Sequence, residues 1–177
     1  MPTLLPSLPA SARVWWFAAD RDLPPRTLQA VRAWLPTWTS HGRPVTAEAD
    51  VVADCVLVVG AVIAPEDWNA GVSGCGIDAM THVVERAFTE AGVAQVPALS
   101  VTYREANGPW QTVPRPAFRR LAREGAVTGA TRVLDLTATD LAAARAHGVD
   151  RPAAEAWHGR AFRLGAARLG TEADAPA

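Results

Sequence analysis

The most conspicuous absence from the chain is lysine, because all 17 basic residues are arginine. A lysine Schiff base is therefore excluded as a catalytic device. A nucleotide-binding P-loop is excluded as well, since that motif needs a lysine after its glycines. Alanine is abundant alongside arginine, and together they indicate GC-rich coding. A single arginine therefore carries little weight as a functional signal.

Cysteine is also scarce, with only Cys55 and Cys75 among 177 residues. Nothing else in the sequence resembles a disulfide scaffold, so we expect two reduced thiols in a cytoplasmic protein. The first twelve residues lack a basic region and are broken by prolines, which argues against a signal peptide. The longest apolar run, residues 51–64, is interrupted by Asp54 and Gly60 and is too short to span a bilayer.

The chain has no surplus of charge of either sign, because its formal net charge is −1. We therefore expect neither nucleic acid nor a membrane as a partner, and a small molecule as the candidate ligand. A length of 177 residues and a hydrophobic content of 49% are ordinary for one soluble domain. The sequence predicts a loose segment over 1–11, a single domain over 12–169 and a disordered tail over 170–177.

Hydrophobic periodicity predicts a chain of mixed secondary structure. Strands are predicted at 13–19, 45–50, 55–63, 98–104, 110–113 and 132–136, and helices at 26–38, 75–91, 114–124, 140–146 and 154–169. The first hundred residues thus run strand, helix, strand, strand, helix, strand, which is the split β-α-β order of the ferredoxin-like fold. We expect an α+β domain with a ferredoxin-like antiparallel sheet, helices on one face, and a C-terminal α/β extension.

The directions of these elements place three distant polar segments at one end of the sheet. If the first strand runs upward, three segments lie at the bottom: the turn after the first helix, the loop before the second helix, and the end of the fourth strand. They hold His41, the Ser73–Asp78 turn and Arg104, respectively. The topology therefore predicts one polar site assembled from all three.

The segment Ser73-Gly74-Cys75-Gly76-Ile77-Asp78 carries the strongest chemical signal in the sequence. Its glycines allow a sharp turn with uncovered backbone N–H groups, and the helix that follows directs its positive end at that turn. One hypothesis makes Cys75 a thiolate nucleophile that pairs with His41. A second hypothesis makes the turn an anion-binding site to which Arg104 supplies charge.

A plain helix cap is the third hypothesis for this turn. Ser73 or Cys75, together with Asp78, would then bond the free N–H groups of the first turn. Asp78 also opposes a thiolate, because it places negative charge beside the thiol. We expect no metal and no cofactor, since Cys75 and His82 are two turns or roughly 10 Å apart and no paired ligand spacing occurs.

Four motifs occur along the chain: Trp38-Thr39-Ser40-His41-Gly42, then Ser73-Gly74-Cys75-Gly76-Ile77-Asp78 with His82, then Tyr103-Arg104, then Trp157-His158. In this order they resemble a family of small bacterial proteins known chiefly from Bacteroidetes-type genomes. The resemblance covers roughly residues 13–163, and Ser-Gly-Cys-x-Ile-Asp is its most specific part. Members often carry the label of an ABC transporter ATPase, but this sequence has neither a P-loop nor an L-S-G-G-Q-like signature. The resemblance implies a shared site and no particular reaction. The matching residues are Trp38, His41, Gly42, Ser73, Gly74, Cys75, Ile77, Asp78, His82, Tyr103, Arg104, Trp157 and His158.

The sequence therefore predicts a polar pocket centred on Cys75 and His41. This pocket would bind a small anionic ligand, with cysteine-based transfer or hydrolysis as its chemistry. The alternative is a non-catalytic accessory or interaction domain in which the Ser-Gly-Cys turn is structural. The predicted ligand-binding residues are Ser73, Gly74, Gly76, Asp78, Arg104 and His158.

Overall fold

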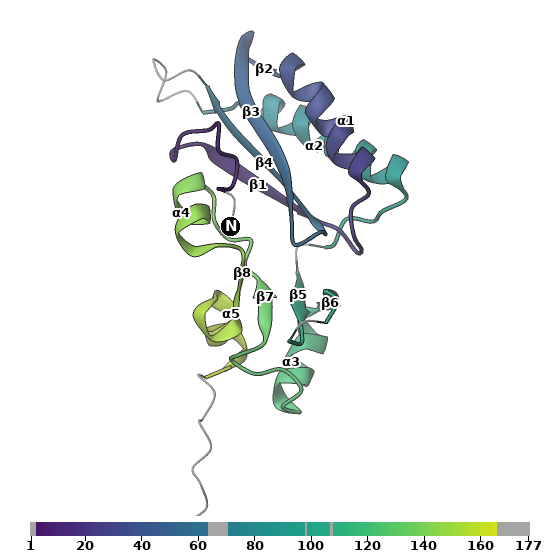
Figure 1. Cartoon of the computed structure of the whole chain (residues 1–177), viewed down its shortest axis with the longest axis vertical. Helices are drawn as coiled ribbons and strands as arrows, with labels where there is room; N and C mark the ends of the chain where they lie inside the picture. Colours follow the sequence, from purple (N-terminus) through teal and green to yellow (C-terminus); the bar gives the residue numbers. More distant parts are fainter. Residues whose placement is uncertain (1–2, 64–70, 98, 107, 166–177) are drawn as a thin grey trace, which may run out of the picture. The chain divides into compact units, whose positions relative to one another are not determined.

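Two four-stranded antiparallel sheets with helices form the framework of the protein, which is an α+β fold as predicted (Figure 1). The computed structural model describes residues 3–63, 71–97, 99–106 and 108–165. Where the sequence predicts one domain, contacts divide the chain into two compact units. The first unit comprises Met1–Ala98 and Leu136–Val149, and the second comprises Leu99–Asp135 and Asp150–Ala177. The predicted tail over 170–177 lies outside the described residues.

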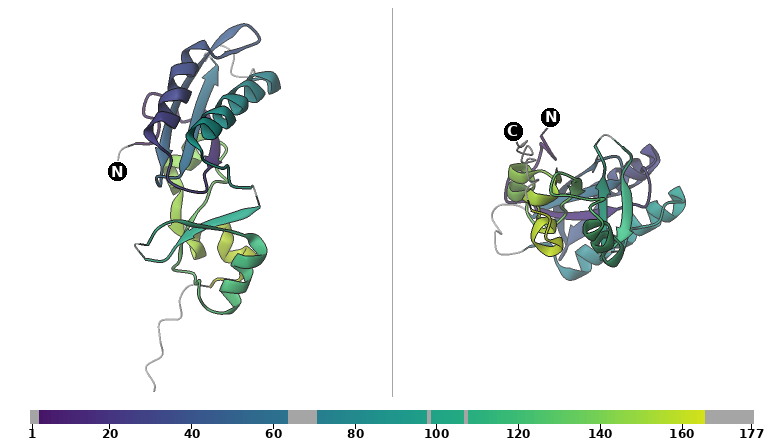
Figure 2. Two further views of the ribbon diagram at one scale, coloured as in Figure 1. Left: turned by 90° about the vertical axis from the view of Figure 1, so that its right-hand side faces the viewer. Right: turned by 90° about the horizontal axis from the view of Figure 1, so that it is seen from below.

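The first unit follows the predicted split β-α-β order as far as its second long helix. Its sheet has the strand order β1-β4-β3-β2, and α1 and α2 lie side by side on one face (Figure 2). The elements are β1 Arg13–Ala18, α1 Pro25–Trp34, β2 Thr39–Ser40, β3 Arg43–Val52, β4 Val56–Ile63, α2 Gly74–Ala91 and α4 Leu141–His147. A 3₁₀ turn over Leu35–Thr37 ends α1, where Pro36 interrupts the helical pattern.

The predicted fourth strand of this sheet lies in the second sheet instead. After α2 the chain returns to the end of β1, where the N–H of Val96 donates to the carbonyl oxygen of Ala18 at 2.8 Å. Pro97 follows directly and has no N–H with which to continue a ladder. The strand over 100–104 then pairs with partners in the second unit.

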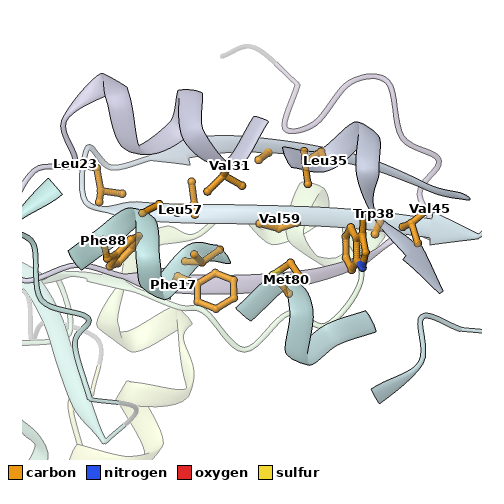
Figure 3. Packing of buried hydrophobic residues seen from close by; sticks show 14 of the residues in the cluster. Phe17, Leu23, Val31, Leu35, Trp38, Val45, Leu57, Val59, Met80 and Phe88 are labelled. Atoms are coloured by element: carbon orange, nitrogen blue, oxygen red, sulfur yellow. The ribbon is translucent and has the colours of Figure 1, made fainter. Parts of the chain in front are cut away.

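The central strand β4 is buried on both faces, which explains why residues 56–63 form a continuous apolar run. Side chains alternate along a strand, so Leu57 and Val59 pack with α1 and α2 while Val58 packs in the opposite layer. Figure 3 shows the helix-side layer, where Val31 of α1 and Met80 of α2 meet the sheet. This layer is the main core of the first unit.

Residues 3–12 pack against the opposite face of the sheet, although the sequence predicts a loose segment over 1–11. Leu5 and Leu8 are 0% and 4% exposed and share a cluster with Val58 and with Leu141 of α4. This packing was not predictable from local sequence because the partners lie far along the chain. The sheet is therefore covered on both sides, with α1 and α2 on one side and this segment with α4 on the other.

Arg145 of α4 fastens the N-terminal segment to the unit. Its guanidinium donates to the carbonyl oxygens of Leu4, Leu5 and Leu8 at 3.0, 2.7 and 3.0 Å. Gly60 of β4 leaves the necessary space, because a Cβ there would lie 2.6 Å from Cδ1 of Leu5. The segment is held by both apolar contact and hydrogen bonding.

The described part of the second unit contains the sheet β6-β5-β7-β8 and two short helices. Its elements are β5 Ser100–Arg104, β6 Gln111–Pro114, α3 Arg115–Arg123, β7 Arg132–Leu134, β8 Asp150–Pro152 and α5 Trp157–Phe162. The predicted hairpin between β5 and β6 is present, whereas β8 was not predicted. The helix predicted over 154–169 is shorter: a 3₁₀ turn over Ala153–Glu155 precedes α5, which ends at Phe162.

Aromatic edge-to-face contacts organise the core of this unit. The ring of Phe118 on α3 lies 5.4 Å from that of Tyr103 and 4.8 Å from that of Phe162, measured between centroids. These separations are in the range that favours T-shaped aromatic pairs. In the part of the chain that the structure describes, no helix has the length and apolarity to cross a bilayer.

Candidate functional site

The Ser-Gly-Cys turn is the start of α2, and Ser73 is its N-cap. Ser73 has extended backbone angles, and its Oγ accepts a hydrogen bond from the N–H of Gly76 at 3.2 Å. This is the side-chain bond that satisfies one of the free donors of a helix start. The geometry confirms Ser73 as a cap. Cys75 then occupies the second helical position and is exposed.

Ser40 connects this cap to the hairpin that carries His41. The backbone N–H of Ser73 donates to Oγ of Ser40 at 2.9 Å, and Oγ of Ser40 lies 3.0 Å from Oγ of Ser73. Ser40 is 2% exposed and Ser73 is half-buried, so both hydrogen bonds are partly buried. Two segments separated by 33 positions are thereby joined at one point.

Trp38 makes a second connection between the same two segments. Its indole Nε1 donates to the carbonyl oxygen of Gly76 at 3.0 Å in the interior. The absence of a side chain at residue 76 leaves room for Val72 and Ser73, because a Cβ there would lie 3.0 Å from Cγ1 of Val72 and 3.3 Å from Oγ of Ser73. The same Cβ would be 3.5 Å from the indole nitrogen, which is an ordinary contact distance. Gly76 therefore has a packing role, whereas a Cβ on Gly74 would meet nothing within 4 Å.

His41 lies at the tip of a two-residue hairpin between β2 and β3. Ser40 pairs with Arg43, and the two residues between them, His41 and Gly42, have φ values of 52° and 75°. Two left-handed residues in succession are the signature of a type I′ turn, which matches the twist of the flanking strands. The imidazole of His41 is exposed at this tip.

Asp78 and His82 lie further along α2. Both are exposed, and Asp78 is the fifth residue of the helix, so it lies just beyond the first turn. The predicted residues Ser73, Gly74, Cys75, Gly76 and Asp78 thus all belong to the first five positions of α2 or to its cap. Among the described residues, no group of three or more His, Cys, Asp or Glu is arranged to hold a metal ion.

Arg104 belongs to the second unit, where its guanidinium is engaged. Its Nη2 lies 2.6 Å from Oδ2 of Asp150, and its Cζ lies 4.6 Å from the ring centroid of Trp110. Arg132 contacts the other carboxylate oxygen of Asp150 at 2.8 Å. These contacts give Arg104 a structural role within its own unit. The predicted convergence of Arg104 with His41 and the α2 turn required β5 to be the fourth strand of the first sheet, and β5 belongs to the second sheet.

His158 is also in the second unit, as a buried member of the aromatic core. It is 1% exposed and stacks on Trp157 with 3.9 Å between ring centroids. Burial lowers the pKa of His158 to about 4, an effect that Arg115 adds to and Asp135 opposes. Within the described residues its Nδ1 has no hydrogen-bond partner. These surroundings are those of a neutral core histidine.

The two thiols have contrasting environments. Cys55 is buried immediately before β4, and burial raises its pKa to about 11, with Asp22 and Asp54 adding to the shift. Cys75 is exposed at the helix start. We therefore expect a thiol reagent in solution to react with Cys75 before it reacts with Cys55.

Sequence reasoning missed the contribution of Ser40 and Trp38 to this region. Trp38 fits the apolar spacing of the preceding helix, so the sequence around it indicates only a core residue. Its hydrogen bond to Gly76 of α2 could not be predicted from that spacing. Ser40 stands between exposed residues and looks like an ordinary turn serine. Only the pairing of β2 with β3 turns its hydroxyl toward Ser73.

Comparison with protein-family models, with curated proteins and with solved structures finds no match for this chain.

Proposed function

We propose that the N-terminus of α2 and the adjoining hairpin tip form a binding site for a small anionic ligand, with the Cys75 thiol as its reactive group. The observation that supports this most is the pair of hydrogen bonds between Ser40 and Ser73. They hold the strand that precedes His41 against the cap that precedes Cys75. Of the two candidate catalytic residues, His41 directly follows Ser40 and Cys75 lies two positions after Ser73.

The helix start supplies the attraction for an anion. The first N–H groups of an α-helix have no intrahelical partners, and the helix dipole places partial positive charge there. Gly74 and Cys75 are the first two residues of α2, and both are exposed. An anionic ligand group at this end would accept hydrogen bonds from the backbone, which requires no basic side chain.

A thiol becomes a nucleophile when a neighbouring base accepts its proton. In the proposed chemistry, the imidazole of His41 takes the proton of the thiol and the sulfur of Cys75 forms a bond to an electrophilic carbonyl carbon of the ligand. The leaving group departs with the bonding electron pair and receives the proton from the imidazolium. Water then releases the acyl group from sulfur, so the overall reaction is hydrolysis.

Alkylation of Cys75 by iodoacetamide near pH 7, followed on its peptide by mass spectrometry, tests the reactive thiol. We expect Cys75 to be labelled faster than a cysteine in an unstructured peptide, and His41→Ala to slow the labelling several-fold. His82→Ala is the matched control, because His82 is an exposed histidine further along α2. Cys55 is the internal control and should react slowly because it is buried with a raised pKa.

A second candidate function is a non-catalytic accessory or interaction domain, and the bond from Gly76 to Oγ of Ser73 favours it. In that case the turn exists to start α2, and Cys75 is a surface residue. Labelling of Cys75 at the rate of the model peptide, unchanged by His41→Ala, would support this candidate and contradict the first. Thermal shifts across a metabolite library, compared between wild type and Cys75→Ala, would then be the same for both proteins.

A further inference from the structure

A pocket of about 520 Å³ lies within the second unit, between α3 and the end of α5. Its size is within the range of small-molecule binding sites. Three of its six lining residues are arginines and the other three are apolar, so it combines positive charge with a surface that an organic group can contact. The lining residues are Arg119, Ala122, Arg123, Ala161, Phe162 and Arg163.

No described residue neutralises the charge of these arginines. In residues 3–63, 71–97, 99–106 and 108–165, no hydrogen bond or ion pair engages the guanidinium of Arg119, Arg123 or Arg163. The buried or half-buried carboxylates of the unit are used elsewhere: Asp150 contacts Arg104 and Arg132, and Asp135 contacts Arg151.

The second unit is basic even though the chain is nearly neutral. Its described residues include nine arginines and five carboxylates, so positive charge is in excess there. The net charge of the whole chain, −1, conceals this distribution because the first unit is acidic. The overall charge therefore gave no sequence signal for an anion site in this unit.

The three guanidinium groups lie at one pocket although two local features disfavour arginine at these positions. Arg119 and Arg123 are four positions apart on α3, where like charges repel. Arg163 is the C-cap that follows the last residue of α5, with φ 57° and ψ 38°, a left-handed conformation in which glycine is usual. Arginine is less favourable than glycine in this backbone conformation. Here it adds a third positive group to the same pocket.

The aromatic wall orients one of these groups. The Cζ of Arg119 lies 5.9 Å from the ring centroid of Phe162, within the distance of a cation–π contact. The guanidinium is thus held at the apolar wall of the pocket with its N–H groups still available. The planar fork of arginine matches two oxygens of a phosphate, which makes it well suited to bind this group.

We propose that this pocket binds an organic diphosphate, with the guanidinium groups of Arg119, Arg123 and Arg163 on its phosphates and its organic part against Phe162. The limited volume and the mixed lining of the pocket favour such a molecule over a nucleic-acid backbone, which follows an extended basic groove. This site is separate from the α2 site of the first unit, and each can fail without the other.

Calorimetric titration of the full chain with pyrophosphate tests the phosphate-binding part of the proposal. We expect Arg123→Gln and Arg163→Gln to weaken binding about tenfold or more each, because each removes a charge-assisted contact. Arg120→Gln and Arg160→Gln are matched controls, since both residues are exposed on the same two helices and outside the pocket lining. These controls, and Cys75→Ala, should change the affinity less than twofold.

Arg163→Gly separates binding from folding. Glycine accepts the left-handed backbone of residue 163, so this variant should be at least as thermally stable as wild type. We nevertheless expect it to bind pyrophosphate as weakly as Arg163→Gln. Phenyl phosphate should bind more tightly than inorganic phosphate, because its ring can contact Phe162.

The proposal is overturned if pyrophosphate does not bind, or if the two control arginines matter as much as the pocket arginines. It is also overturned if a single-stranded oligonucleotide binds more tightly than pyrophosphate with equal losses in all four glutamine variants. Equal losses in the control and pocket variants, with pyrophosphate or with the oligonucleotide, would mean that the arginines form a general basic surface.

Discussion

The indole Nε1 of Trp38 donates a hydrogen bond to the carbonyl oxygen of Gly76, and the two atoms are 3.0 Å apart. The donor follows the end of α1, and the acceptor lies in the first turn of α2. Since both groups are buried, the bond fixes the start of α2 against the segment that leads to His41. The proposed site depends on this attachment together with the contact between Ser40 and Ser73.

Trp38→Phe should lower the free energy of unfolding by about 2 kcal/mol, because it removes one buried hydrogen bond and leaves part of the indole space empty. Urea denaturation measures this change. Trp34→Phe is the control: Trp34 packs against Trp38 with 5.4 Å between ring centroids and an interplanar angle of 35°. Because Trp34 is half-buried, we expect a smaller loss. Equal losses in the two variants would show that the hydrogen bond to Gly76 adds nothing.

Ser40→Ala and Ser73→Ala should each destabilise the protein by about 1 kcal/mol, and their effects should not add. Each hydroxyl takes part in the contact between the two serines, and Ser73 also caps α2. A double-mutant cycle by urea denaturation should give a coupling energy of about 0.5 kcal/mol or more. Strict additivity would contradict the direct link between the hairpin and the helix.

Gly60→Ala should destabilise the protein by about 1–3 kcal/mol, as overpacking of a close-packed core does. The added methyl would lie 2.6 Å from Cδ1 of Leu5 and 2.8 Å from Cδ1 of Leu8, and both leucines are buried. Gly74→Ala is the control, because its Cβ would meet nothing within 4 Å. Thermal unfolding measures both, and a neutral Gly60→Ala would mean that residues 3–12 do not pack on β4.

Acidification should destabilise the second unit through His158. Its folded pKa of about 4 lies below the usual 6.5, so the native state binds fewer protons than the unfolded state between these values. The stability that the neutral imidazole provides is therefore complete above pH 6.5 and is lost as the pH falls toward 4. For this group alone, the free energy of unfolding should fall by about 2 kcal/mol between pH 7 and pH 5.

His158→Phe removes the titrating group and keeps an aromatic ring beside Trp157. We expect its unfolding free energy to depend less on pH over this window than that of wild type, measured by urea denaturation at each pH. His147→Ala is the control, because His147 is exposed at the end of α4. The same pH dependence in wild type and His158→Phe would contradict a buried neutral imidazole.

Local patterns were sufficient to predict most individual elements. The apolar stripe of α2 and the terminating Gly92, which has φ 70°, place that helix correctly. The apolar run of β4 reads as a central strand because both of its faces are buried. The hairpin between β3 and β4 was harder to locate, since Ala53 and Asp54 adopt left-handed angles without an Asn-Gly signal.

Long-range placement was the part that the sequence did not reveal. Nothing near Leu5 indicates that its partners are Gly60 and a guanidinium from α4, more than fifty positions away. β5 belongs to the second sheet because it pairs with β7. The apolar run of β7 is short and does not indicate from the sequence which strand it pairs with. The sequence could therefore predict the helix start at Ser73 but not its link to Ser40.

The most direct test of the proposed α2 site is a titration of the ¹⁵N-labelled chain with inorganic phosphate, followed by amide chemical shifts. We expect saturable shifts at Gly74, Cys75 and His41 that are separate from any shift at Arg163. Ser40→Ala should weaken the response at His41, because it loosens the hairpin from the helix. Unchanged amide shifts at Gly74 and Cys75 at saturating phosphate would contradict a binding site at the start of α2.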